Sequence, residues 1–378
     1  MLLKRTVFVL VCIYILLTVT GCWDSLDANN KTLVITVITD KQGDDYAFYI
    51  EMPNLGVGQN QQTGNGDSKQ KYYMVYANGS SFADARRHID AKLDNPIFLG
   101  TVRALVITDD LAKYGIEEYM LRLQSDNQYR KALNIVTSYS DPQEILSVMP
   151  PNNISIGESI ADTLVSLKSL GKIVIYTLSD ILEFVYSDTC YALVNLDVED
   201  GKFAYNGYTI FHNNQLIDFI PFEEANGLVW ILGDNIKRIY TIPFKDFTAT
   251  LNVQAKSKSI TPTYEDGKLV FDIKYEMEAK LMYLSQVIQF DEGMQNAAKA
   301  ELQNKIANEI AKTIEHSKEI NCDYLQFKDC YRIKYPDKLK TINWHDTYEN
   351  AEFRISVKTV LKFGSMMDFE ASDEQLNK

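Results

Sequence analysis

Hydrophobic and polar residues alternate with a period of two in some stretches of this chain and with a helical period in others. Residues 32–39 are β-branched and apolar and residues 46–52 alternate, so both are predicted as strands of a hairpin with a turn at 41–45. The same criteria predict further strands in the first half at 72–77, 102–108, 132–138, 173–176 and 191–198.

Helical patterns occupy the intervals between these strands. Ser81 with Asp84 is typical of a capping box, and Asp141 followed by Pro142 marks another helix start. Because strands and helices alternate, the first half is predicted to form an α/β unit with some parallel pairing. The expected helices begin at residues 82 and 142 and cover 109–123, 156–170 and 179–186.

The second half is richer in strands. Asp266-Gly267 lies between two strand-like runs and predicts a tight hairpin turn there. A closing strand is expected near the C-terminus, after one long helix. The strands predicted for this half are 202–211, 215–220, 247–257, 269–283 and 353–363.

The long helix is predicted at residues 285–317. Its apolar positions step by four residues, so each step overshoots a full turn by about 40° and the apolar stripe winds around the helix. A winding stripe suits a helix that crosses a twisted sheet, whereas a coiled-coil partner would favour a mean spacing of 3.5 residues. We expect the first arrangement. The stripe consists of Ala298, Leu302, Ile306, Ile310 and Ile314.

The N-terminus has the pattern of a bacterial lipoprotein signal. Lys4 and Arg5 precede the uncharged run 6–18, which is shorter than the roughly 20 residues of a membrane-spanning helix. Gly21 and Cys22 follow, which predicts cleavage between them and an S-diacylglycerol, N-palmitoyl cysteine at position 22. The alternative is an ordinary secretory signal with a chance cysteine.

The remaining body, residues 22–378, is apolar enough to fold and strongly acidic. Apolar residues make up 46% of the whole chain, which indicates a folded protein rather than a disordered one. The net charge of the chain is −13, and loss of Lys4 and Arg5 with the signal makes it −15. Such a body is poorly suited to binding nucleic acid or to lying flat on anionic lipid.

These patterns divide the chain into four parts. We expect a lipoprotein signal peptide at 1–21 and an N-terminal α/β region of one or two subdomains at 22–199. A C-terminal domain with a mixed sheet and the long helix is expected at 200–366, before a frayed acidic tail at 367–378. The predicted fold class is α/β with mixed sheets, in several small domains.

Three cysteines remain in the body once Cys12 leaves with the signal and Cys22 carries lipid. They are Cys190, Cys322 and Cys330, and an odd number gives no disulfide framework. Cys322 and Cys330 either form a bridge, if the chain folds back between them, or remain two plain thiols.

The sequence contains no catalytic or metal-binding pattern. The four histidines lack the spacings of metal sites, and no nucleophile elbow, Walker loop or CxxC motif occurs. The carboxylate pairs Asp109-Asp110 and Glu223-Glu224 are expected to be solvated, and Trp230 is expected in the core. We therefore predict no enzyme activity, no catalytic residue, no cofactor and no bound metal.

Several segments resemble the Ger(x)C family of spore germination lipoproteins. Trp23-Asp24 follows the lipoprotein cysteine as in that family, and the stretch from Ala225 to Trp230 is similar to the family's signature. The other similar segments are 82–86, 100–108, 110–116, 207–211, 214–217 and 256–260, with Pro262, Cys322-Asp323, Tyr335-Pro336, Trp344, Val357 and Gly364.

The chain departs from this family at three places. Gly100-Thr101 stands where the family usually has Gly-His, and residues 125–130 lack the first arginine of an Arg-Asp-x-x-Arg-like segment. Leu281-Met282 stands where the family often has a glutamate. Any role of those family residues is therefore not carried over to this chain.

The resemblance implies a non-catalytic C subunit of a nutrient germinant receptor. Such a protein is lipid-anchored on the outer face of the spore inner membrane of an endospore-forming Gram-positive bacterium. Its partners are the multi-pass A and B membrane subunits, and its fold has three α/β domains with mixed sheets. The alternatives are a solute-binding lipoprotein of a membrane transporter, which would need two similar lobes around a cleft, and an envelope enzyme.

Overall fold

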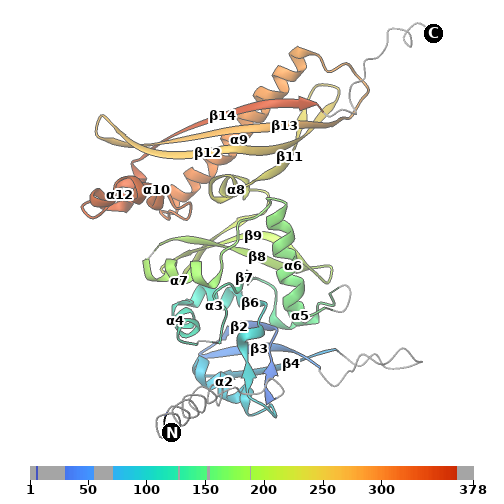
Figure 1. The fold of residues 1–378 in the computed structure, drawn as a ribbon, viewed down its shortest axis with the longest axis vertical. Helices are drawn as coiled ribbons and strands as arrows, with labels where there is room; N and C mark the ends of the chain where they lie inside the picture. Colours follow the sequence, from blue (N-terminus) through green and yellow to red (C-terminus); the bar gives the residue numbers. More distant parts are fainter. Residues whose placement is uncertain are drawn as a thin grey trace, which may run out of the picture.

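The computed structural model describes residue 6 and residues 30–54, 71–126, 128–150, 154–187 and 189–363. These residues form a mixed α/β fold with three sheets arranged along one long axis (Figure 1). None of the helices in this described part is long and apolar enough to cross a membrane. The predicted α/β class with mixed sheets is therefore confirmed.

An eight-stranded sheet, hereafter the large sheet, is formed by strands between Thr36 and Pro221, in the order β10-β9-β8-β7-β6-β2-β3-β4. Strands β2, β6 and β7 are parallel, whereas β2 and β3 form the predicted antiparallel hairpin. The strands are β2 (Thr36–Gln42), β3 (Asp45–Pro53), β4 (Tyr72–Gly79), β6 (Ala104–Thr108), β7 (Asn134–Ser138), β8 (Tyr191–Glu199), β9 (Lys202–His212) and β10 (Gln215–Pro221).

Helices cover both faces of the large sheet. One face packs against α2 (Phe82–Asp90), α3 (Asp109–Tyr114), α4 (Glu117–Ser125) and α7 (Leu178–Ser187). The other packs against α5 (Pro142–Ser147) and α6 (Ile156–Ser169). A small sheet of β1 (Thr32–Leu33) and β5 (Ile97–Phe98) lies beside it, with the 3-10 turn η2 (Leu99–Thr101).

Helices α2 and α5 begin at the capping residues that the sequence predicted. The Ser81 hydroxyl accepts the Asp84 N–H at 3.1 Å, as in a capping box, but the Asp84 carboxylate accepts the Ser80 N–H rather than that of Ser81. Asp141 caps α5, with Pro142 at its first position.

Two predictions for the first half are wrong. The single helix expected at 109–123 is two helices, because Gly115 adopts a φ of 127°, which ends α3. The strand expected at 173–176 is absent from the described structure of that segment, which makes only an isolated bridge from Thr177 to Asn134.

The C-terminal unit, residues 226–363, is a four-stranded sheet in the order β11-β12-β13-β14 with helices on one face (Figure 1). The Asp266-Gly267 hairpin joins β12 and β13 as predicted. The elements are α8 (Asn226–Leu232), β11 (Lys237–Pro243), β12 (Thr248–Glu265), β13 (Lys268–Leu284), α9 (Glu292–Glu319), α10 (Phe327–Lys334), α11 (Pro336–Leu339), α12 (Trp344–Glu349) and β14 (Glu352–Phe363).

Helix α9 is the predicted long helix. It begins at Glu292 rather than at 285, because Asp291 caps its first turn through the Met294 N–H at 2.8 Å. All five residues of the winding apolar stripe are buried, and α9 crosses the sheet in Figure 1 as expected.

The boundary expected at 199/200 falls in the turn between β8 and β9, which pair antiparallel from Glu199 and Lys202 onward. The large sheet therefore continues across this position. One hydrophobic core also continues from the α6 face of the large sheet into the C-terminal unit.

Candidate functional site

The residues predicted for cleavage and lipidation, Gly21 and Cys22, lie outside the described residues. Their roles remain predictions. The first described strand, β1, begins at Thr32, ten residues after Cys22. The functional features that the structure does describe are a joint between the large sheet and the C-terminal unit, and a pocket near β1.

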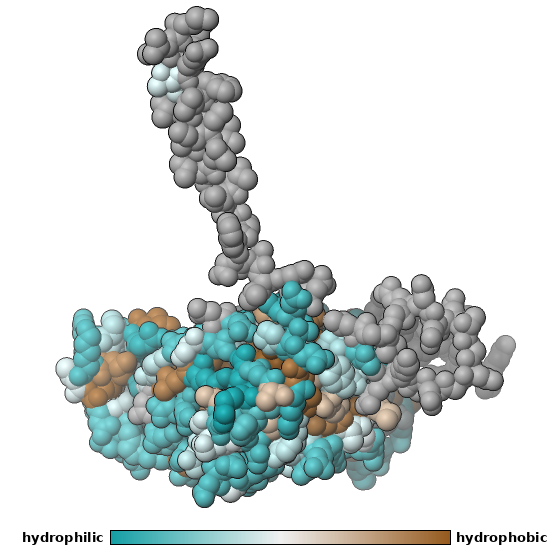
Figure 2. Space-filling view, turned by 90° about the horizontal axis from the view of Figure 1, so that it is seen from below, coloured by the Kyte–Doolittle hydropathy of each residue, from teal (hydrophilic) through white to brown (hydrophobic). Residues whose placement is uncertain are grey.

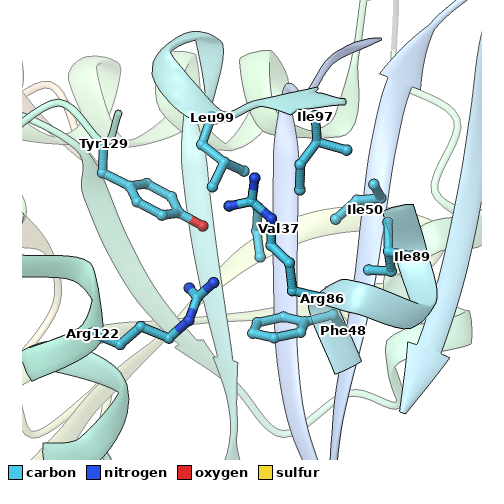
Figure 3. A pocket seen from close by; sticks show the side chains of 9 residues that line it. All are labelled: Val37, Phe48, Ile50, Arg86, Ile89, Ile97, Leu99, Arg122 and Tyr129. Atoms are coloured by element: carbon cyan, nitrogen blue, oxygen red, sulfur yellow. The ribbon is translucent and has the colours of Figure 1, made fainter. Parts of the chain in front are cut away.

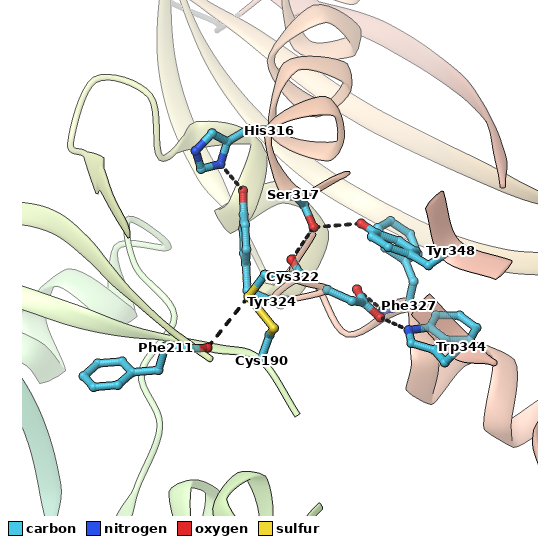
Figure 4. The surroundings of a disulfide bond; sticks show 10 residues. Cys190, Phe211, His316, Ser317, Cys322, Tyr324, Phe327, Trp344 and Tyr348 are labelled. Atoms are coloured by element: carbon cyan, nitrogen blue, oxygen red, sulfur yellow. Dashed lines mark hydrogen bonds between the residues drawn. A yellow bond between two sulfur atoms is a disulfide. The ribbon is translucent and has the colours of Figure 1, made fainter. Parts of the chain in front are cut away.

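A disulfide crosses the joint (Figure 4). Cys190, which immediately precedes β8, is bonded to Cys322, which follows α9, and their Cα atoms are 5.6 Å apart. Neither predicted state of Cys322, a bridge to Cys330 or a plain thiol, is therefore correct, and Cys330 is free within α10. Burial raises the pKa of the Cys330 thiol. Cys190 lies 132 residues before Cys322, so no local pattern could have paired them.

Polar contacts complete the joint. The His316 ring on α9 contacts the Asp218 carboxylate of β10 through Nε2 at 2.8 Å and the Tyr324 hydroxyl through Nδ1 at 2.9 Å. The Gln326 amide donates to the Tyr176 hydroxyl at 2.8 Å. Three residues of the stretch 316–326, namely His316, Cys322 and Gln326, thus contact β10, the residue before β8 and the segment between α6 and α7. The joint is therefore a connection with several fixed contacts rather than a free linker.

Asp323 organises the short helices next to the disulfide. Its carboxylate accepts the N–H groups of Phe327 at 3.0 Å and Lys328 at 2.8 Å, and the Trp344 indole N–H at 3.2 Å. Burial raises the pKa of Asp323 to about 7, although these three donors act in the opposite direction. Asp323 therefore fixes the start of α10 and the position of α12.

The signature-like stretch from Ala225 to Trp230 forms α8 and packs inside the C-terminal unit. A side chain at Gly227 would overlap Thr313 and the Glu309 carbonyl oxygen of α9, so only glycine allows this approach. The Trp230 indole donates to the Tyr240 hydroxyl at 2.9 Å, which confirms Trp230 as a core residue.

Lys258, in the stretch Lys256 to Ile260, binds the end of the same helix. Its ammonium group donates to the carbonyl oxygens of Ile231 at 2.9 Å and Gly233 at 2.8 Å. Burial lowers the pKa of Lys258. A cation at this end of a helix interacts favourably with the helix dipole. The residues of these two family-like stretches that we describe here, Gly227, Trp230 and Lys258, therefore have packing roles.

A narrow pocket lies between α2, α4 and the large sheet (Figure 3). Its free volume is about 10 Å³, and the guanidinium groups of Arg86 and Arg122 and the Tyr129 hydroxyl point toward its centre. We call it the arginine pocket. Its apolar wall consists of Val37, Phe48, Ile50, Ile89, Ile97 and Leu99.

The other titratable groups that the sequence singled out do not assemble into a site. Asp109 forms an ion pair with Lys113 at 2.6 Å, while burial and Asp109 raise the pKa of Asp110. Glu223 and Glu224 are exposed. On α12, three exposed side chains offer ligand atoms within 4.8 Å of one another, an arrangement common without a metal: His345, Asp346 and Glu349.

Two family models match the chain over nearly its whole length. The spore germination protein N-terminal domain matches residues 24–198, and the C-terminal domain described as spore germination B3/GerAC like matches residues 206–362. The chain is therefore a spore germination protein. It belongs to the GerAC-like family of these proteins.

Curated relatives support the same family at full length. Spore germination protein YndF of Bacillus subtilis (strain 168) is 22% identical, over 96% of this chain and 98% of YndF. Spore germination protein B3 of the same organism is 20% identical, over 94% of this chain and 97% of its own. The crystal structure of the GerBC protein has the same fold, with a TM-score of 0.57, 15% identity, and coverage of 86% and 96%.

Proposed function

We propose that this protein is the lipid-anchored, non-catalytic C subunit of a spore nutrient germinant receptor. The observation that carries the proposal is the pair of germination family models, which together match residues 24–198 and 206–362. The lipoprotein pattern ending at Cys22 supports an anchor on the outer face of the spore inner membrane.

The shape of the protein suits a subunit that holds partners together. The chain enters near α2 and β4 at one end of the long axis, and the four-stranded sheet forms the other end (Figure 1). With Cys22 in the membrane, the C-terminal unit would project outward and present its free sheet face to the A and B subunits. The joint would transmit force or movement between the two ends, because a disulfide and a continuous core connect them.

The end that carries the chain start is mainly hydrophilic, with separate apolar areas between polar ones (Figure 2). Such a surface favours attachment through acyl chains over insertion of the protein itself. Two acyl chains give stable attachment, because each buried methylene contributes about 0.8 kcal/mol.

Co-purification from the sporulating host tests the proposal. The tagged full chain is extracted from the spore inner membrane with a mild detergent, and its partners are identified by mass spectrometry. Recovery of one A-type and one B-type membrane subunit is the expected result. A transporter permease and ATPase in their place would overturn it and favour a solute-binding lipoprotein.

The solute-binding alternative has less structural support. Ligand pockets for small molecules usually have volumes of about 300–1,000 Å³ and apolar linings. The arginine pocket has about 10 Å³. A larger depression, about 610 Å³, runs along the polar face of α9 at Glu301, Asn304, Lys305, Ala307, Asn308, Glu309 and Lys312.

A further inference from the structure

The ion pairs of the arginine pocket are unevenly shared between its two arginines. Arg86 is neutralised by Asp126 at 3.4 Å and Asp90 at 3.6 Å. Arg122 lies one helical turn before Asp126, yet within the described part of the chain it forms no ion pair and no side-chain hydrogen bond. Its guanidinium lies 5.9 Å from the Phe48 ring centroid, half-buried. Among the described residues, both carboxylates thus contact Arg86, and the Arg122 guanidinium contacts neither of them.

The donors of the pocket converge. The Arg122 guanidinium and the Tyr129 hydroxyl point into the same small space, with Arg86 on the opposite side (Figure 3). Arg122 lowers the pKa of Tyr129 against the larger opposing effect of burial. Planar guanidinium groups bind carboxylate and phosphate oxygens with charge-assisted hydrogen bonds, which are stronger than neutral ones.

The size of the pocket limits what enters it. A volume of about 10 Å³ holds no more than about one water-sized group. A whole nutrient molecule does not fit there. An anionic oxygen of a larger molecule fits, with its adjacent carbon against the apolar wall and the rest of the molecule outside.

The pocket also lies beside β1, which begins only ten residues after the expected anchor at Cys22. Ile97 lines the pocket and pairs with Thr32 of β1, the first described strand. The ten residues from Cys22 to Thr32 span at most about 36 Å when extended. The net charge of −13 repels anions in general, so an anion held here would be held by these short-range contacts.

We propose that Arg122, Tyr129 and Arg86 form a binding site for one phosphate or carboxylate group. The group belongs either to a membrane lipid headgroup or to a free small anion. Arg122 supplies the unpaired charge, Arg86 completes the rim, and the apolar wall holds the first carbon of the ligand. Only the lipid source depends on the proposed anchor.

Ligand-induced stabilisation of the full chain in dodecyl maltoside micelles tests this site. The probes are inorganic phosphate, propionate, glycerol 3-phosphate and dihexanoyl-phosphatidylglycerol below its critical micelle concentration, all at constant ionic strength. We expect saturable rises in melting temperature with wild type. Arg122→Gln should bind at least tenfold more weakly, because a charge-assisted contact is lost. Arg130→Gln, which removes an exposed arginine eight residues away, should bind like wild type.

Tyr129→Phe removes one hydroxyl and keeps the ring, so it should fold normally and bind several-fold more weakly. This second variant decides the question if Arg122→Gln is unfolded. A lipid probe at least tenfold tighter than glycerol 3-phosphate identifies a lipid headgroup, and equal affinities identify a free anion. The proposal is wrong if no probe saturates, or if Tyr129→Phe and Arg122→Gln bind as Arg130→Gln does. The measurement needs no receptor subunit, so its outcome does not depend on the outcome of the co-purification.

Discussion

At the scale of single residues, two carboxylates accept the free N–H groups at the starts of helices. Glu51 on β3 accepts the N–H groups of Ile156 at 2.8 Å and Gly157 at 3.3 Å, at the start of α6. Burial raises the pKa of Glu51, and the positive end of the helix favours its charged form. Asp323 has the same role for α10. The role of Glu51 could not be predicted from sequence, since its partners lie more than a hundred residues away, whereas the partners of Asp323 on α10 are local.

The raised pKa of Asp323 predicts a specific pH dependence. Its folded pKa of about 7 exceeds the ordinary value of 3.8, so the folded state binds a proton that the unfolded state has released. The stabilising contribution is complete below pH 3.8 and is lost as the pH rises through 7, by at most about 1.4 kcal/mol per pH unit.

Asp323→Asn should remove this slope. In urea unfolding between pH 4 and 8, the wild-type stability should fall relative to the variant as the pH rises. Asp337→Asn, at a side chain 95% exposed, serves as the control and should follow wild type. If the stability of all three proteins changed with pH in the same way, the pH dependence could not be due to the raised pKa of Asp323.

At the scale of elements, periodicity predicted most strands and helices, and failed where a single backbone position or a distant contact decided the outcome. Gly115 divides one predicted helix in two through its positive φ. The apolar stripe of α9 was predictable because it repeats at five positions, whereas α8 is only seven residues long and mostly buried. Its sequence is apolar on every side because it is buried on every side, so it carries no helical period.

The close approach of α8 to α9 gives a test with a matched control. Gly227→Ala adds one methyl group against Thr313, so it should destabilise the protein by about 1–3 kcal/mol despite the better helix propensity of alanine. Gly293→Ala makes the same change in the exposed first turn of α9 and should be neutral or slightly stabilising. Denaturant unfolding compares the two. Equal stabilities of the two variants would show that the helices tolerate a wider separation.

At the scale of the whole molecule, the joint between the large sheet and the C-terminal unit is what the sequence left unpredicted. The residues that form it are separated by about a hundred positions, as for Asp218 and His316 or Cys190 and Cys322. The lipoprotein signal pattern and the segments similar to the family are each short and contiguous, so they can be recognised in the sequence. The arginine pocket could not be predicted, because its residues come from β2, β3, α2, β5, η2, α4 and the loop between α4 and β7.

The disulfide should contribute substantially to stability, because reduction or substitution frees a loop of 132 residues in the unfolded chain. The double variant Cys190→Ala/Cys322→Ala should lose roughly 2–5 kcal/mol in unfolding free energy. Cys330→Ala should lose much less, since Cys330 is a free thiol. Thiol labelling under denaturing, non-reducing conditions, followed by peptide mapping, checks the pairing: label on Cys190 and Cys322 would contradict it.

The anchor prediction concerns where the whole molecule resides. If Cys22 carries the lipid, Cys22→Ala leaves no thiol for the diacylglycerol, and the signal should stay uncleaved or the protein should be mislocalised. Spores should then respond poorly to at least some germinants, because the body is no longer held beside its partners. Cys330→Ala, which also removes one thiol, should incorporate labelled palmitate and localise like wild type. Palmitate labelling and normal germination of Cys22→Ala would instead place the attachment elsewhere and leave position 22 as a chance cysteine.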